Sequence, residues 1–276
     1  MSLGALGLAL GAAVLHALWN LLVAGARDTQ LATAAALTCG VVLLTPAALV
    51  IGGIPSHAAP WIVASAAIEL LYFSLLAAAY AVGELSVTYP LARGLAPVFL
   101  VVVGATTGIG GAVAPIEVFG IGGVAVGIVA VRGMRTAGGW REVVLAATIG
   151  ACIAGYTLVD REGIQGAQPL TYLWLVLALA TPPYLVAMWR LRGGPALRAA
   201  FSPVTALAGL AIFGAYVLVL TALKLGASAS AVGAVRECSV VIVTAFAAAF
   251  LHERVGATRW AGAVLVTGGI IAIALG

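Results

Sequence analysis

Long apolar runs, separated by short breaks of polar residues, glycine and proline, follow one another along the whole chain. A helix that crosses a bilayer needs about 20 mostly apolar residues, and ten runs approach that length. They cover residues 3–23, 31–52, 60–82, 86–108, 114–132, 142–159, 168–190, 203–224, 228–250 and 258–275. Because the breaks are short, neighbouring helices should run antiparallel. The pattern predicts an all-α integral membrane protein with ten transmembrane helices.

The composition supports this interpretation. Charged residues make up 8% of the chain and apolar residues 63%, whereas a soluble domain carries about 25% charged residues. No basic cluster suits a nucleic acid, and the three cysteines show neither a disulfide framework nor a metal-ligand spacing. The first run contains His16, Trp19 and Asn20 and lacks a basic start, which favours a retained helix over a signal peptide. We expect a lipid bilayer around the protein, and no metal or cofactor.

The ten runs divide into two sets of five that can be laid over each other, with Arg93 falling on Arg236. The predicted units are a first repeat, a linker and a second repeat, over residues 1–133, 134–140 and 141–276. Because five is odd, the two repeats would enter the membrane from opposite sides. Such an inverted repeat is the plan of many secondary transporters.

The basic residues of the loops predict the orientation. Apart from Arg93 and Arg236, nine arginines fall on one side of the predicted membrane, and Arg161 and Lys224 fall on the other. The nine are Arg27, Arg132, Arg135, Arg141, Arg190, Arg192, Arg198, Arg254 and Arg259. Cytoplasmic loops carry the excess of Lys and Arg. This rule places the nine arginines in the cytoplasm and both termini outside.

Two arginines lie inside apolar runs. Arg93 and Arg236 are each about eight residues, or roughly 12 Å, from a helix end. A charge at this depth is costly unless it is paired or hydrated. From equivalent helices the two should meet at a central cavity, where their planar donor forks would hold a carboxylate or phosphate. The alternative is that each pairs with an acid, Glu69 or Glu237.

Two prolines flank the first of these arginines. Pro97 leaves the carbonyl of Arg93 without its helical donor, and Pro90, Arg93 and Pro97 share a helix face at spacings of three and four. A helix broken or loosened at these prolines would suit the wall of a cavity. The alternative is a kink that only shapes the bundle.

Two acids and several aromatic residues complete the candidate site. Glu69, in the middle of the third run, can bind a substrate amine, exchange a proton or pair with Arg93; Glu237 is a second candidate for proton coupling, or braces a neighbouring helix. Asp160 shares a helix face with Tyr156 and is expected at the water boundary. The other candidates for substrate contact, with packing as the alternative role, are His16, Trp19, Asn20, Tyr72, Tyr80, Tyr156 and Tyr216.

Three stretches resemble the drug/metabolite transporter superfamily with two EamA-type repeats: "LHALWNLLV" (15–23), "AAYAVGELSVTYPLARGLAPVFLVVVGA" (78–105) and "FLHERVGATRWAGAVLVTGGIIAI" (250–273). The first repeat departs from the pattern at residues 110–113, where glycine, alanine and valine replace the acidic-basic pair. The resemblance implies a multi-pass inner-membrane transporter that commonly exports amino acids or related metabolites. Members commonly have cytoplasmic termini, the reverse of what the loop charges predict here.

No nucleotide-binding loop, zinc-protease motif or serine triad is found, which argues against an enzyme and against ATP as the direct energy source. We therefore predict a secondary active transporter, an exporter of an amino acid or related zwitterion, that works by alternating access with protons as a candidate coupling ion. One alternative is an exchanger of phosphorylated or other anionic metabolites. Another is a flippase for a lipid-linked substrate. The sequence predicts no oligomeric state.

Overall fold

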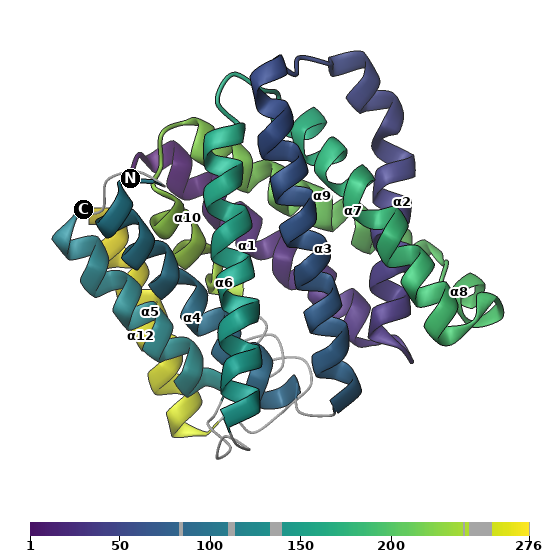
Figure 1. The fold of residues 1–276 in the computed structure, drawn as a ribbon. Coiled ribbons are helices and arrows are strands. Elements are labelled where there is room, and N and C mark those ends of the chain that lie inside the picture. Colours follow the sequence, from purple (N-terminus) through teal and green to yellow (C-terminus); the bar gives the residue numbers. More distant parts are fainter. Residues whose placement is uncertain (83–84, 110–113, 133–139, 240, 243–255, 276) are drawn as a thin grey trace.

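The computed structural model describes residues 1–82, 85–109, 114–132, 140–239, 241–242 and 256–275 (Figure 1). This part of the chain is helical and contains no strand. Its helices are α1 (Leu3–Ala24), α2 (Thr29–Ile51), the short 3-10 helix η1 (Ser56–Ala58), α3 (Ala59–Val82), α4 (Leu85–Thr107), α5 (Pro115–Arg132), α6 (Trp140–Gly163), α7 (Pro169–Arg192), α8 (Gly194–Ala199), α9 (Pro203–Lys224), α10 (Ala229–Arg236) and α12 (Ala257–Leu275).

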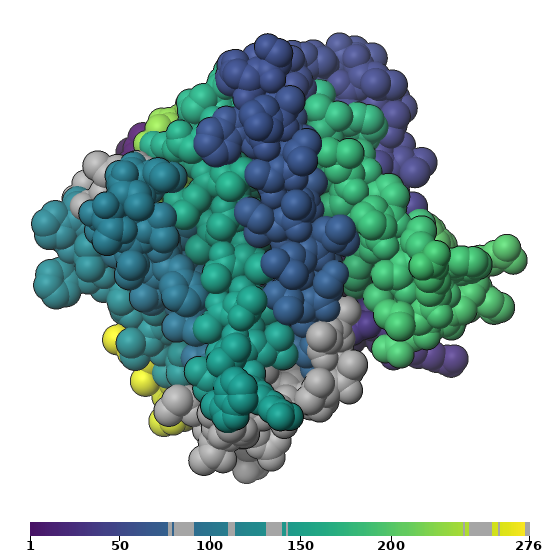
Figure 2. Space-filling view, viewed as in Figure 1, coloured from purple at the N-terminus to yellow at the C-terminus, as the bar shows by residue number. Residues whose placement is uncertain are grey.

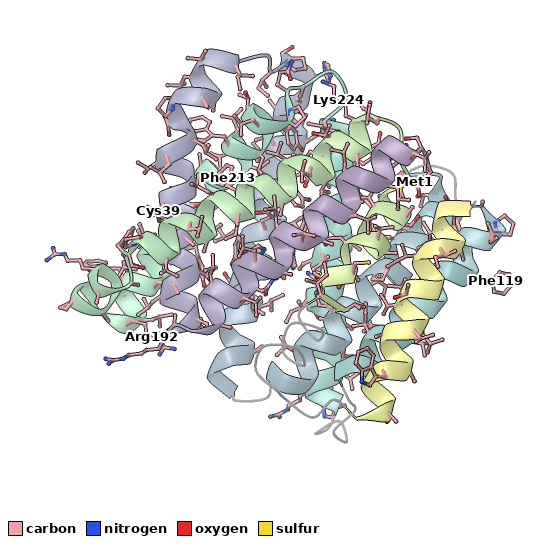
Figure 3. All side chains as sticks on the ribbon, turned by 180° about the vertical axis from the view of Figure 1, so that it is seen from behind. Met1, Cys39, Phe119, Arg192, Phe213 and Lys224 are labelled. Atoms are coloured by element: carbon pink, nitrogen blue, oxygen red, sulfur yellow. The ribbon has the colours of Figure 1, made fainter. Side chains whose placement is uncertain are left out.

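The described helices are long and apolar enough for a multi-pass membrane protein. Six segments can cross a bilayer by length and composition, in α1, α2, α3, α6, α7 and α9, and α4, α5 and α12 contain shorter apolar stretches. Large apolar side chains point outward from them, as Phe119 does with 81% exposure (Figure 3). Outward apolar residues suit contact with lipid tails.

Local sequence signals set several helix ends. The Asp28 carboxylate accepts hydrogen bonds from the backbone N–H groups of Gln30 and Leu31 and so starts α2. A reciprocal capping box between Ser202 and Thr205 starts α9. These caps satisfy backbone donors that the first helical turn leaves without partners.

Glycines let several helix pairs approach closely. A Cβ at Gly127 of α5 would lie 2.7 Å from the Gly262 carbonyl of α12, and Gly120 and Gly269 face each other in the same way. At the contact of α2 with α9, Gly40 lies against the ring of Phe213, labelled in Figure 3. Small residues at such crossings allow membrane helices to pack backbone to backbone.

The helices pack in a pattern that pairs the two halves of the chain. Helix α1 packs along α9 and α3 packs along α6, while α4 contacts α6 and α1 contacts α10. Helix α2 contacts both α9 and α7, α7 also contacts α3, and α5 runs along α12. The face in Figure 2 is formed by α3 and α6, with α4 and α5 on one side and α7 and α8 on the other. Ten helices in an inverted repeat remain a prediction.

The predicted helix over residues 228–250 is not continuous. Helix α10 ends at Arg236, Glu237 forms a turn as its C-cap, and residues 238–239 are helical again. Residues 243–255 lie outside the described part. By contrast, α4 runs without interruption from Leu85 to Thr107, through both prolines at which a break was expected. The interruption among these central helices therefore falls at Glu237, directly after Arg236.

Candidate functional site

A cavity of about 400 Å³ lies between helices of both halves of the chain. Residues from α1, α2, α3, α4, α6, α7, α9 and α10 line it. The lining extends to Ala24 and Thr29, where α1 ends and α2 begins, on either side of the loop that contains Arg27. The predicted contact residues that line it are His16, Trp19, Asn20, Glu69, Tyr72, Arg93, Tyr156, Tyr216 and Arg236.

A buried ion pair joins α4 to the interruption that follows α10. The Nε of Arg93 donates to Oε2 of Glu237 at 2.8 Å, and these side chains are 3% and 1% exposed. Arg93 also lines the cavity, whereas Glu237 is not among the lining residues. Both expectations for Arg93, pairing with an acid and exposure to a cavity, therefore meet in one residue.

The second arginine has a different environment. Arg236 is 4% exposed and lines the cavity, and its Nε has no hydrogen-bond partner in the described part of the chain. Its charge acts on the Glu69 carboxyl and on the Tyr156 hydroxyl. A guanidinium that is buried without a full set of acceptors is well suited to bind an added anion.

Glu69 supplies a carboxyl group to the same cavity. It lies midway along α3, is 6% exposed and lines the cavity. The Asp160 carboxyl and the Arg236 guanidinium both lie within its electrostatic range. The cavity thus presents a guanidinium and a carboxyl group to whatever enters it.

Asp160 is not at the water boundary, where the sequence pattern placed it. It is 0% exposed and accepts hydrogen bonds from Tyr172 at 3.1 Å and from Tyr216 at 2.5 Å. These three residues, the Asp160 cluster, join α6, α7 and α9. Sequence reasoning missed Tyr172 altogether, and the only signal for the cluster was the four-residue spacing of Asp160 from Tyr156 on one helix face.

Aromatic rings form much of the remaining wall. Tyr156 packs edge-to-face against Tyr72 and against Tyr216, with ring centroids 6.1 and 5.8 Å apart. Phe73 and Tyr184, neither predicted as a contact residue, lie tilted against each other with ring centroids 5.4 Å apart and line the same cavity. Such rings offer flat apolar surface and a negative face for a cation.

The α1 candidates are held together by local hydrogen bonds. The Trp19 indole donates to Nδ1 of His16 at 3.2 Å, and the Asn20 amide donates to the His16 carbonyl at 2.7 Å. These bonds fix the three side chains on the cavity side of α1. The Tyr80 and Pro90 side chains, also predicted to contribute, lie outside the described part of the chain.

The described residues contain no His, Cys, Asp and Glu cluster that suits a metal ion. Comparison with known proteins supports a transporter. The model of the EamA-like transporter family matches residues 140–275. No curated protein sequence matches the chain. Solved structures do match, in 27 chains.

One of these matches is a crystal structure described only as that of a protein, with a TM-score of 0.76 and 19% identity over 98% of each chain. At this identity the likeness concerns the fold alone. With the family match over its second half and the apolar helices of the whole chain, this protein is a multi-pass membrane protein that belongs to the EamA-like transporter family of the drug/metabolite transporter superfamily.

Proposed function

We propose that the protein is a secondary active transporter for small zwitterions, amino acids above all. One observation carries the proposal: Arg236 and Glu69, both more than nine-tenths buried, line one cavity with a guanidinium and a carboxyl group. A guanidinium binds a carboxylate through paired donors. An acid and aromatic faces bind an ammonium group. A cavity of about 400 Å³ falls within the size range of small-molecule sites.

The charge balance around the cavity favours a zwitterion over a phosphate ester. Arg93 is already neutralised by Glu237. A doubly charged phosphate would therefore meet Arg236, which has no ion-pair partner among the described residues, with the Glu69 and Asp160 carboxyls in electrostatic range of it. A zwitterion brings no net charge into the same space. Moving a net charge into a poorly hydrated site is expensive, so the phosphate alternative is disfavoured.

Alternating access is supported by how the two halves of the chain pack. The contact of α1 with α9 corresponds to that of α6 with α3 when the two predicted repeats are exchanged, and that of α4 with α6 corresponds to that of α10 with α1. Rocking one repeat against the other would open the cavity to each side in turn. The cavity lining extends to Ala24 and Thr29, on either side of the loop that contains Arg27, one of the arginines that the loop charges place in the cytoplasm. In the inner membrane, with the termini outside, this end would admit a cytoplasmic substrate for export, with Glu69 as the candidate proton carrier.

Purified protein in proteoliposomes tests the proposal. We expect uptake of a tritiated amino-acid mixture against unlabelled amino acid, and competition by free amino acids but not by their methyl esters, which lack the carboxylate. Replacement of a charge-assisted hydrogen bond, as in Arg236→Gln, should weaken apparent affinity by about 10- to 150-fold. The exposed Arg198→Gln is the matched control. Competition by a phosphate ester and not by amino acids would show that the substrate class is wrong.

A further inference from the structure

The two intramembrane arginines differ in one respect that bears on how the empty transporter moves. Arg93 has its own buried acid, Glu237, at 2.8 Å. Arg236 has no ion pair of this kind in the described residues, and its Nε lacks a hydrogen-bond partner. Arg93 therefore has a direct ion-pair partner, whereas Arg236 has the Glu69, Asp160 and Glu237 carboxyls only within electrostatic range and keeps its Nε without an acceptor in the described part of the chain.

We propose that Glu237 is an internal counter-ion that lets the empty transporter change its access without substrate. This inference rests on the proposed function, because it assumes alternating access around the cavity. Glu237 is 1% exposed and is not among the cavity-lining residues, so it is placed to neutralise Arg93 from the protein side. A substrate carboxylate that binds Arg236 then need not bind Arg93 as well.

The energetic reason is the cost of moving an uncompensated charge through a closed state. While the cavity is open, water can solvate Arg93; when both ends close around an empty cavity, that water is largely lost. Removing one partner of a buried ion pair leaves a charge whose desolvation is not offset. Without Glu237 the direct ion pair of Arg93 is lost, and a substrate carboxylate is then the anion that can restore it, which favours exchange of one substrate for another over net transport.

The position of the pair suits this role. Arg93 belongs to α4 and Glu237 to the turn after α10, the two helices that the predicted repeats make equivalent. The pair is therefore a contact between the two repeats that would rock against each other. Arg93 faces the cavity as well, so a change in the charge of Glu237 would be felt where the substrate binds.

The test compares net efflux with exchange in proteoliposomes loaded with a tritiated amino-acid mixture. Wild type should perform both. In Glu237→Gln, exchange should persist, while net efflux should fall by roughly 100-fold, equivalent to about 2.7 kcal/mol at 1.36 kcal/mol per tenfold change in rate. Glu162→Gln, which removes an acid that is 35% exposed, should alter neither flux. Equal loss of both fluxes in a folded Glu237→Gln protein, or no loss of either, would overturn the proposal.

A second variant keeps the test decisive if Glu237→Gln does not fold. In Arg93→Gln/Glu237→Gln both members of the pair are absent, so position 93 needs no counter-ion and net efflux should continue at a rate close to that of exchange. Exchange without net efflux in this double variant contradicts the counter-ion role. Failure of the wild type to carry any amino acid is a different result, since it refutes the proposed substrate class before any variant is compared. Wild type that exchanges amino acids but shows no net efflux refutes the counter-ion role alone.

Discussion

Removal of a single hydroxyl group from the Asp160 cluster tests how far buried hydrogen bonds hold α6, α7 and α9 together. Tyr216→Phe keeps the ring that packs against Tyr156 and deletes the donor that lies 2.5 Å from Oδ2 of Asp160. Tyr172 remains as a donor to Oδ1 at 3.1 Å. Because Asp160 is 0% exposed, bulk water cannot replace the missing donor.

The expected loss in the free energy of unfolding depends on whether hydrogen-bond energies from soluble proteins or from membrane proteins apply. A hydrogen bond to a charged group contributes about 1.5–3 kcal/mol in soluble proteins, whereas interhelical bonds in a membrane protein average about 0.6 and reach about 1.7 kcal/mol. The short distance and full burial place Tyr216 near the top of the membrane range. We expect Tyr216→Phe to lower the free energy of unfolding by about 1.5 kcal/mol and Tyr172→Phe by about 1 kcal/mol. The double variant should lose at least about 0.5 kcal/mol more than the sum, because both donors serve one carboxylate.

Equilibrium unfolding in mixed micelles, followed by tryptophan fluorescence, measures these differences. Thr148→Val is the matched control, since it also deletes a hydroxyl, but one on an exposed residue that bonds to the Val144 carbonyl of its own helix. It should change the free energy of unfolding by less than about 0.3 kcal/mol. If both tyrosine variants unfold like this control, the hydroxyls do not stabilise the fold and the reasoning fails.

Three further predictions concern packing, coupling and orientation. Gly127→Leu should destabilise by about 3 kcal/mol or prevent folding, because a Cβ there meets the α12 backbone, while Gly122→Leu, with open space, should be tolerated in the same unfolding assay. In Glu69→Gln, transport should no longer respond to an imposed pH gradient; a variant still driven by the gradient would place the proton elsewhere. A cysteine at Leu225 should react with an impermeant maleimide in intact cells, and one at Arg198 only after permeabilisation, in a background without the native cysteines; the opposite pattern reverses the topology.

The helices were predictable because the bilayer imposes a simple rule of length and apolarity. The residues of the cavity were partly predictable for a related reason: a charge in an apolar run must find a partner or a wet space. Arg93, Arg236 and Glu69 could therefore be expected near one another, and they line one cavity. Whether they bind a substrate stays a prediction.

The partners within the site could not be predicted. Which acid pairs with Arg93 depends on how the helices are rotated and how they cross. Hydropathy carries no information about either, so the sequence left Glu69 and Glu237 both open as partners. Asp160 was expected at the surface because it ends an apolar run, yet Tyr172 and Tyr216 bury it completely. Both cases depend on side chains from other helices, and the periodicity of one helix carries no information about them.

The end of α10 gives the neighbouring residues Arg236 and Glu237 different surroundings. In a regular helix, consecutive side chains point about 100° apart. Here α10 ends between them, and Glu237 takes a turn conformation that places its carboxylate on Arg93 while Arg236 lines the cavity. An ion pair between Arg236 and Glu237 would have neutralised both charges and left Arg93 without this partner. Because the helix ends at this point, Arg236 lines the cavity while Glu237 pairs with Arg93, and this arrangement follows from the backbone as much as from the side chains.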